Sequence, residues 1–210
     1  KKIKKFEFIH PDLMFGNDES FVFFDDKGSI LKFSQNSKLI WKRNHYTKKQ
    51  IKQKPIIYFA TNNNLLIAAD TLSNLYAMDY SNGNLVWKIN NNFPYNSDIK
   101  IFKNKIYLVD FENNIRCYSI EDGKELWSFG TEKTFIKSQR KLSLIIKDNI
   151  IVFIDSLGDI NALDINNGRL IWQSQTINED IFESAFLLKS SRLVNDDYSL
   201  YVSNNRSNFV

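Results

Sequence analysis

Four tryptophans, the only ones in a chain of 210 residues, recur at intervals of about 40–46 residues, and a fixed period in this range is the sequence signature of repeat architectures. Each tryptophan ends a copy of the same short pattern. In repeat folds each unit packs mainly on its neighbours, so this spacing constrains the fold more than any single residue does. The four are Trp41, Trp87, Trp127 and Trp172.

The pattern around the tryptophans indicates a β-hairpin. In three copies an Asn-Gly or Asp-Gly dipeptide places a glycine four residues before the tryptophan, and such dipeptides tolerate the positive φ of tight turns. An aspartate or serine stands eight residues before the tryptophan, where its side chain can accept backbone N–H groups of the turn. The first copy lacks the glycine, and its turn is one residue shorter. The glycines are Gly83, Gly123 and Gly168, and the residues at the second position are Asp79, Ser119 and Asp164.

Two more apolar runs precede each hairpin, which makes four strands per unit. No window shows the apolar spacing of a long amphipathic helix. We therefore predict an all-β fold, a β-propeller of four-stranded antiparallel blades. The runs expected to be first strands are residues 55–60, 99–102 and 142–146, and those expected to be second strands are 21–24, 65–69, 106–111 and 150–154.

Two copies read Ala-x-Asp, then Gly, then Trp at fixed spacing, and this pattern resembles the repeat of the PQQ-like, or quinoprotein-like, propeller family. The copies that begin at Ala77 and Ala162 fit the pattern fully, and the resemblance covers about residues 10–205. It implies that each tryptophan docks between neighbouring blades beside the last hairpin. A structural role is thereby implied for the four tryptophans, the three hairpin glycines, Asp79 and Asp164. The positions that depart from the pattern are Lys32 and Ser34 in the first copy and Cys117 and Ser119 in the third.

A single domain of repeated units is expected to fill residues 1–210. The resemblance implies a propeller of eight blades, of which about four and a half would be present, so the chain is expected to be a fragment. A short propeller of four or five blades is the alternative, since about four to eight blades can close a ring. Runs at residues 182–188 and 199–205 are expected to begin the fifth unit. The repeats are expected at approximately 10–43, 55–90, 97–130, 142–175 and, in part, 182–210.

The chain carries a formal net charge of +4, and the excess gathers in the links between units one and two and between units three and four. Basic links of this kind could bind an acidic partner or an anionic membrane surface. Solvated loops in a lysine-rich protein are the simpler interpretation, which the sequence favours. Nucleic acid is disfavoured, because the aromatic residues do not interleave with the basic ones. The basic residues of the links are Lys42, Arg43, His45, Lys48, Lys49, Lys52 and Lys54, and then Lys133, Lys137, Arg140 and Lys141.

Few residues have the surroundings that catalysis or metal binding requires. Cys117 aligns with alanines in two other copies, which indicates a small packed residue rather than a nucleophile. His10 and His45 do not stand at a metal-ligand spacing. Three acid pairs lie in expected turns, namely Asp25-Asp26, Glu121-Asp122 and Asp196-Asp197. We therefore predict no catalytic residue, no cofactor-binding residue, no metal ligand and no cofactor.

A non-catalytic scaffold for protein–protein interaction is the favoured function, because the blades are regular and their turns carry no site motif. The closest resemblance is to the BamB-like outer-membrane assembly lipoproteins. It implies a periplasmic, outer-membrane-associated bacterial protein with a lipid anchor upstream of residue 1, whose partner is the periplasmic repeats of the barrel-inserting protein. One alternative is a PQQ- and calcium-dependent dehydrogenase, although the chain has no adjacent pair of cysteines. The other is a PQQ-like sensor module of a larger receptor or kinase.

Overall fold

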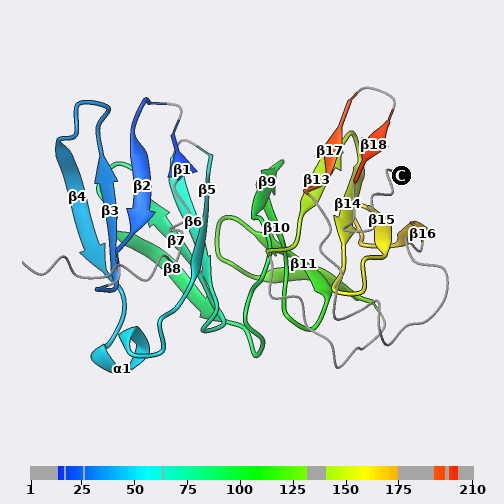
Figure 1. Cartoon of the computed structure of the whole chain (residues 1–210), viewed down its shortest axis with the longest axis horizontal. Helices are drawn as coiled ribbons and strands as arrows, with labels where there is room; N and C mark the ends of the chain where they lie inside the picture. Colours follow the sequence, from blue (N-terminus) through cyan, green and yellow to red (C-terminus); the bar gives the residue numbers. More distant parts are fainter. Residues whose placement is uncertain are drawn as a thin grey trace, which may run out of the picture.

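The computed structural model describes residues 14–16, 18–25, 27–62, 64–131, 141–174, 192–196 and 199–202. In these residues the chain forms four four-stranded antiparallel sheets and a two-stranded pair (Figure 1). Each four-stranded sheet is one blade, and its strands are ordered as they occur in the sequence. The prediction of an all-β fold built from four-stranded antiparallel blades is confirmed.

The strands of the four blades follow one another along the chain, with one short helix between the first two blades. Blade 1 consists of β1 (Met14–Phe15), β2 (Phe21–Phe24), β3 (Ser29–Phe33) and β4 (Leu39–Asn44). Blade 2 consists of β5 (Ile57–Thr61), β6 (Leu65–Asp70), β7 (Asn74–Asp79) and β8 (Leu85–Asn90). Blade 3 consists of β9 (Lys100–Phe102), β10 (Lys105–Val109), β11 (Asn114–Ser119) and β12 (Glu125–Gly130). Blade 4 consists of β13 (Leu144–Lys147), β14 (Ile150–Ile154), β15 (Ile160–Asp164) and β16 (Leu170–Ser174). The last pair is β17 (Val194–Asn195) and β18 (Leu200–Tyr201), and the helix is α1 (Lys48–Ile51).

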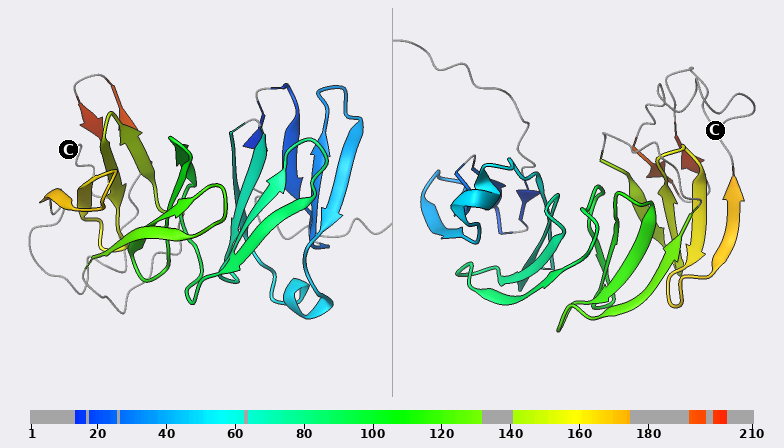
Figure 2. Two further views of the ribbon diagram at one scale, coloured as in Figure 1. Left: turned by 180° about the vertical axis from the view of Figure 1, so that it is seen from behind. Right: turned by 90° about the horizontal axis from the view of Figure 1, so that it is seen from below.

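The blades stand around an arc with their first strands toward its inside. Seen from below, they follow one another in sequence order (Figure 2, right view). The first strands of blades 2, 3 and 4 are neighbours, since β9 contacts both β5 and β13. A parallel bridge between Ser97 and Leu142 also links the entrances to blades 3 and 4. The fourth strand of each blade lies at the outer edge, and no residue of β8, β12 or β16 is fully buried.

The middle strands of a blade are apolar on both faces because a neighbouring blade covers each face. In β6, Leu66 and Ala68 pack toward blade 1, whereas Ile67 and Ala69 pack toward blade 3. All four side chains are fully buried. Successive side chains of a strand point to opposite faces, so an unbroken apolar run is the pattern of a strand that is covered on both sides.

Four hydrophobic cores hold the structure together, and each is shared by consecutive units. The first joins Val22 of blade 1 to Leu66 of blade 2. The fourth joins Val152 of blade 4 to Leu193 and Val202, which flank the β17–β18 pair. Because each of the four cores in the described residues is shared between units, the stability of each blade depends on its neighbours, as in other repeat proteins.

The hairpin between the third and fourth strands recurs in detail. Gly83, Gly123 and Gly168 have φ values of 73°, 73° and 71°, a region that glycine enters without a Cβ penalty. In blade 1 the shorter turn reaches the same region with Ser37 at φ 59°, so this copy forms its hairpin without a glycine. In every blade a β-bulge follows the residue that pairs with the tryptophan.

The observed strands differ from the predicted ranges by up to two residues at their ends. The run 142–146 was expected to be paired throughout, but Leu142 bridges Ser97 instead and β13 begins at Leu144. The run 106–111 ends early because Asp110 begins a turn. The predicted strand at 182–188 lies outside the described residues, and β17 was not predicted. The helix α1 was also not predicted, because four residues are too few to show a helical period.

Candidate functional site

Each of three interfaces between blades contains a tryptophan that lies against a glycine of the next blade. Trp41 is 5% exposed, and its indole N–H donates to the Tyr80 carbonyl at 3.1 Å. A Cβ placed on Gly83 would lie only 2.7 Å from Cε3 of Trp41. This is well inside the optimal separation of about 3.5–4.0 Å between nonbonded carbons, so the ring occupies space that only a glycine leaves open.

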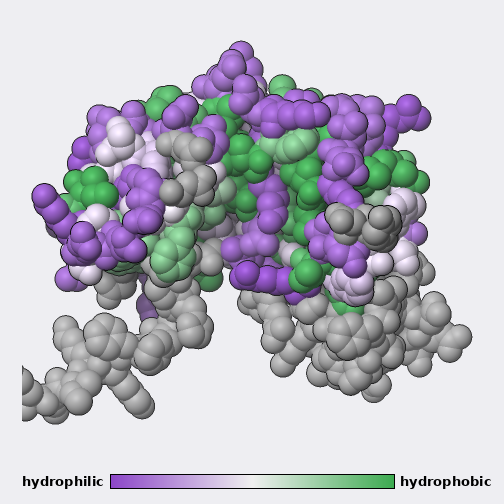
Figure 3. Space-filling model, turned by 90° about the horizontal axis from the view of Figure 1, so that it is seen from above, coloured by the Kyte–Doolittle hydropathy of each residue, from purple (hydrophilic) through white to green (hydrophobic). Residues whose placement is uncertain are grey.

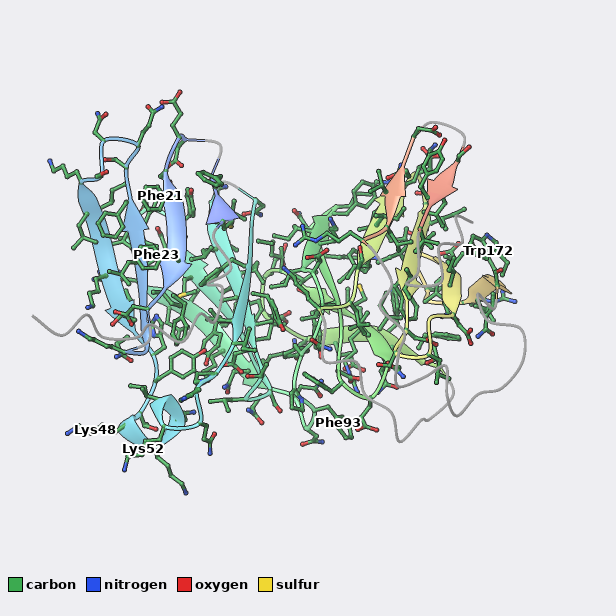
Figure 4. All side chains as sticks on the ribbon, in the orientation of Figure 1. Phe21, Phe23, Lys48, Lys52, Phe93 and Trp172 are labelled. Carbon is green, nitrogen blue, oxygen red and sulfur yellow. The ribbon has the colours of Figure 1, made fainter. Side chains whose placement is uncertain are left out.

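The second interface repeats this geometry. Trp87 donates to the Ile120 carbonyl at 2.9 Å, and a Cβ on Gly123 would lie 2.9 Å from its ring. Trp172 at the end of the series is 41% exposed (Figure 4). Within the described part of the chain no glycine lies against it.

The third interface keeps the ring contact but changes the hydrogen bond. A Cβ on Gly168 would lie 2.5 Å from Cε3 of Trp127. The Trp127 indole N–H is buried and finds no acceptor. The Ile165 carbonyl, which corresponds to the acceptors of the other two interfaces, accepts the Tyr107 hydroxyl at 3.4 Å instead. The contact between ring and glycine is therefore the constant feature of these interfaces, and the hydrogen bond is not.

The recurring aspartates of the pattern hold the hairpin turns. Asp79 Oδ1 accepts the backbone N–H groups of Ser81 at 2.8 Å and Asn82 at 3.2 Å. Hydrogen bonds from the side chain and backbone of Ser81 hold the pKa of this exposed carboxyl below its usual value. Asp164 Oδ1 accepts the Asn166 N–H at 2.8 Å in the same way. Both carboxylates bind their own turns.

A second recurring aspartate, which sequence reasoning missed, stands in the turn between the second and third strands of every blade. Each accepts two backbone N–H groups, from the residues two and four positions later. The period of about 40–45 residues, the same as that of the tryptophans, is the signal that could have found them. The four are Asp25, Asp70, Asp110 and Asp155.

Asp70 shows how deeply such a turn can be built into the core. The residue is fully buried, and its Oδ2 accepts the hydroxyls of Tyr46 at 2.7 Å and Tyr76 at 2.8 Å. Burial and the neighbouring Asp70 charge raise the pKa of both phenols, so both stay protonated and donate. The carboxylate is thus satisfied on both oxygens.

Blade 1 departs from the family pattern at Lys32, which stands where two other blades have alanine. The residue is 3% exposed, and Nζ donates to Asp18 Oδ2 at 2.9 Å and to the Tyr80 carbonyl at 3.2 Å. Burial opposes ionisation of Asp18, but hydrogen bonds from Ser20, Lys32 and Tyr80 outweigh it and hold the pKa of this carboxyl well below its usual range. The buried cation is therefore paired, as a buried charge has to be.

Two residues with reactive side chains, Cys117 and His45, lie in the described part of the chain. Cys117 is fully buried, and burial raises the pKa of its thiol to about 11, so the nucleophilic thiolate is scarce at neutral pH. Burial, followed by the charges of Lys88 and Arg43, lowers the pKa of His45. His10 lies outside the described residues. Among the residues that the structure describes, no group of three or more His, Cys, Asp or Glu side chains could hold a metal ion.

The outer strands present apolar side chains to solvent just before the tryptophans. In blade 2, Leu85 is 45% exposed and Val86 is 54% exposed, and β8 pairs on one side only. An exposed apolar pair on an unpaired strand edge is a surface that a partner strand can use. Seen from above, hydrophobic side chains show in the middle of the molecule and in smaller groups at both ends (Figure 3). The equivalent exposed residues are Leu39, Ile40, Leu126, Leu170 and Ile171.

The structure describes only some of the basic residues in the two links between blades. Lys133, Lys137 and Arg140 lie outside the described residues. Lys141 pairs with Asp98 at 2.9 Å, which neutralises it. The link between blades 1 and 2 includes α1 and its exposed lysines. No helix of the described residues is long and apolar enough to cross a membrane.

Residues 26–210 match the family model described as "Outer membrane protein assembly factor BamB". Among curated proteins, the factors of that name from Escherichia coli (strain K12) and Shigella dysenteriae serotype 1 (strain Sd197) are each 26% identical over 113 residues. These matches cover 54% of this chain and 27% of each relative, so the aligned part is about a quarter of their length.

Two solved structures share the fold at low sequence identity. BamB from Moraxella catarrhalis superposes with a TM-score of 0.70 at 14% identity, covering 92% of this chain and 54% of that one. The computationally designed Ika8 protein superposes with a TM-score of 0.71 at 15% identity, covering 94% of this chain and 56% of that one. The chain thus matches about half of each of these longer structures, and the likeness supports the propeller architecture alone.

Proposed function

Because the chain belongs to the family of the outer membrane protein assembly factor BamB, we propose that it is a non-catalytic scaffold for protein–protein interaction. In this proposal it assists the assembly of outer-membrane β-barrel proteins in the bacterial periplasm. Its partner is the periplasmic repeats of the barrel-inserting protein, and it needs no cofactor.

The family match over residues 26–210 carries the proposal, and the way the repeated polar residues are used supports it. Asp79 and Asp164 bind their own turns. Asp70 is enclosed by two tyrosines, and Cys117 is buried in the core between blades 3 and 4. These polar side chains have structural roles that repeat from blade to blade. This is expected of a scaffold, whose function lies on its surface.

The outer strand edges supply the surface for partner binding in this proposal. At β8 the backbone is unpaired on its outer side, and Leu85 and Val86 offer about half of their surface to solvent. An extended partner segment can add to such an edge through main-chain hydrogen bonds, while alternate side chains supply specificity.

Binding of the purified chain to the immobilised periplasmic repeats from the same organism tests the proposal. We expect saturable binding with a micromolar or tighter dissociation constant. The double substitution Leu85→Ser/Val86→Ser should weaken it at least tenfold if β8 is the edge used. A matched double substitution of exposed polar residues, Lys103→Ser/Lys124→Ser, should leave it unchanged.

Titration with pyrroloquinoline quinone and calcium tests the alternative function, a dehydrogenase. If the chain binds neither the repeats nor the unfolded barrel proteins, but changes the absorbance of the quinone in the presence of calcium, the scaffold proposal is wrong. A dehydrogenase function would then follow.

A further inference from the structure

The helix α1 brings three lysines to the lower end of blade 1, where a fourth lysine lies in a neighbouring turn. Lys48, Lys49 and Lys52 belong to the helix and its C-terminal cap, and Lys27 stands in the turn between β2 and β3. All four are exposed. We refer to Lys27, Lys48, Lys49 and Lys52 as the basic cluster. In Figures 1 and 4 the helix projects beyond the ends of the strands, with Lys48 and Lys52 at its tip.

The helix is held firmly to the blade. Thr47 and Gln50 form a reciprocal capping box, which satisfies two backbone donors at the helix start. The Ile51 side chain lies against Gly28, where an added Cβ would approach it to 2.7 Å. Gly28 has φ 85°, so both its conformation and its lack of a side chain serve this contact. The lysines therefore project from a fixed base.

No acidic residue balances the cluster within the helix, whose first turn contains none. Among the ion pairs of the described residues, none includes Lys27, Lys48, Lys49 or Lys52. Four like charges on neighbouring segments, with no ion-pair partner among the described residues, repel one another, which costs free energy in the isolated protein. An anionic partner that bound here would remove this repulsion.

Three of the four recurring aspartates at the same end of the blades are turned inward, and the fourth, Asp25, pairs with Lys42 at 3.5 Å. Asp70 and Asp110 are fully buried, and Asp155 is 3% exposed. Each is engaged with the backbone N–H groups of its own turn. Their charges therefore face the interior, while the lysines face solvent.

Exposed apolar side chains accompany the lysines. Ile56 follows the helix and is 40% exposed, and Phe93 is 38% exposed. Phe93 lies in the link between blades 2 and 3, which leaves the blades at the same end as α1, and Figure 4 shows it at the lower end of the molecule. Lysines combined with exposed Phe and Ile are typical of segments that lie on a lipid headgroup layer.

We propose that the basic cluster, with Ile56 and Phe93, docks this end of the propeller onto an anionic membrane surface. The lysines contact lipid phosphates, and the two apolar side chains enter the headgroup region. A membrane fits better than an acidic peptide because the lysines stand on a projecting helix, from which they reach a flat surface. This inference goes beyond the proposed protein-binding role and does not depend on it.

Co-sedimentation of the chain with phospholipid vesicles tests the inference. We expect binding to vesicles with about one third phosphatidylglycerol in phosphatidylcholine, and none to pure phosphatidylcholine. Each lysine near an anionic surface contributes about fivefold in binding. The triple variant Lys48→Gln/Lys49→Gln/Lys52→Gln should therefore bind about 100-fold more weakly, and binding should fall steeply as salt rises. Phe93→Ser should reduce vesicle binding by a larger factor at high salt than at low salt.

A matched triple variant distinguishes an effect of the basic cluster from an effect of net charge alone. Lys38→Gln/Lys103→Gln/Lys124→Gln removes the same charge from exposed turns at the opposite end of the blades, and it should keep vesicle binding within about threefold of the unchanged chain. Equal losses in the two triple variants would overturn the inference. It would also be overturned if the chain failed to bind anionic vesicles, or if it bound polyglutamate instead. Circular dichroism confirms that each variant is folded.

Discussion

The indole ring of Trp41 lies against Gly83 in the hairpin of the next blade, where a methyl group would have no room. The ring N–H binds the Tyr80 carbonyl of the same hairpin at 3.1 Å. One side chain thus fixes the position of a turn that belongs to another blade. The same contact between ring and glycine joins Trp87 to Gly123 and Trp127 to Gly168.

Substitution of Trp87 should cost far more stability than substitution of Trp172. Trp87→Ala removes the ring from the core between blades 2 and 3, and loss of a packed aromatic costs about 3–5 kcal/mol. Trp172 is 41% exposed, so Trp172→Ala should cost about 1 kcal/mol or less. Urea denaturation followed by circular dichroism measures both. Similar losses for the two variants would contradict the packing role given to Trp87.

The second set of aspartates should differ in importance according to burial. Asp70→Ala leaves two buried phenols and two turn N–H groups without their acceptor, and we expect a loss of about 3–5 kcal/mol. Asp25 has the same two turn bonds, but its side chain is 19% exposed. Asp25→Ala should therefore cost about 1 kcal/mol, because water replaces the lost acceptor. Chemical denaturation of the two variants at equal protein concentration makes the comparison.

The pair of Lys32 and Asp18 should make the stability of the protein sensitive to acid. The folded-state pKa of Asp18 is held below its usual value, so this carboxylate stabilises the fold above the unfolded pKa of about 3.9. That contribution is lost as the pH falls from there through the lowered folded pKa. In Lys32→Met one of the hydrogen bonds that lower this pKa is absent. We expect the difference in stability between the unchanged chain and the variant to shrink between about pH 5 and pH 2. A difference that stays constant over this range would show that the ion pair does not contribute.

The Cys117 thiol should resist modification in the folded protein. Burial raises its pKa to about 11 and leaves it inaccessible, and both effects slow reaction with thiol reagents. We expect negligible reaction with dithiobis(nitrobenzoic acid) at pH 8, and one thiol per chain after unfolding in guanidinium. Rapid reaction of the native protein would mean that Cys117 is more accessible than its position in β11 indicates.

The sequence predicted the blades well because each hairpin carries its own local signals. The Asn82-Gly83 dipeptide, the apolar runs beside it and the tryptophan that follows all lie within a few residues of one another. Strand ends were less accurate where pairing depends on distant residues, as at Leu142, which bridges Ser97 of the preceding link. Helix α1 escaped notice because one turn has no period to detect.

The polar contacts within the blades were harder to predict because their partners come from different turns. Nothing near Lys32 in the sequence indicates that Asp18 and the Tyr80 carbonyl will surround it. The repeated turn aspartates such as Asp70 were not predicted, although their period in the sequence could have revealed them. Their burial by Tyr46 and Tyr76 was not visible, since it depends on the folded arrangement.

A double-mutant cycle between Trp41 and Gly83 tests most directly whether the tryptophans pack between blades. Gly83→Ala should destabilise the chain by about 2–4 kcal/mol, through strain at positive φ and a clash with the ring. In the background of Trp41→Ala the clash is gone, so the same substitution should cost only about 1 kcal/mol. We therefore expect a coupling energy of at least about 1 kcal/mol between the two residues. Strictly additive losses would contradict the contact and the role that the tryptophans are given.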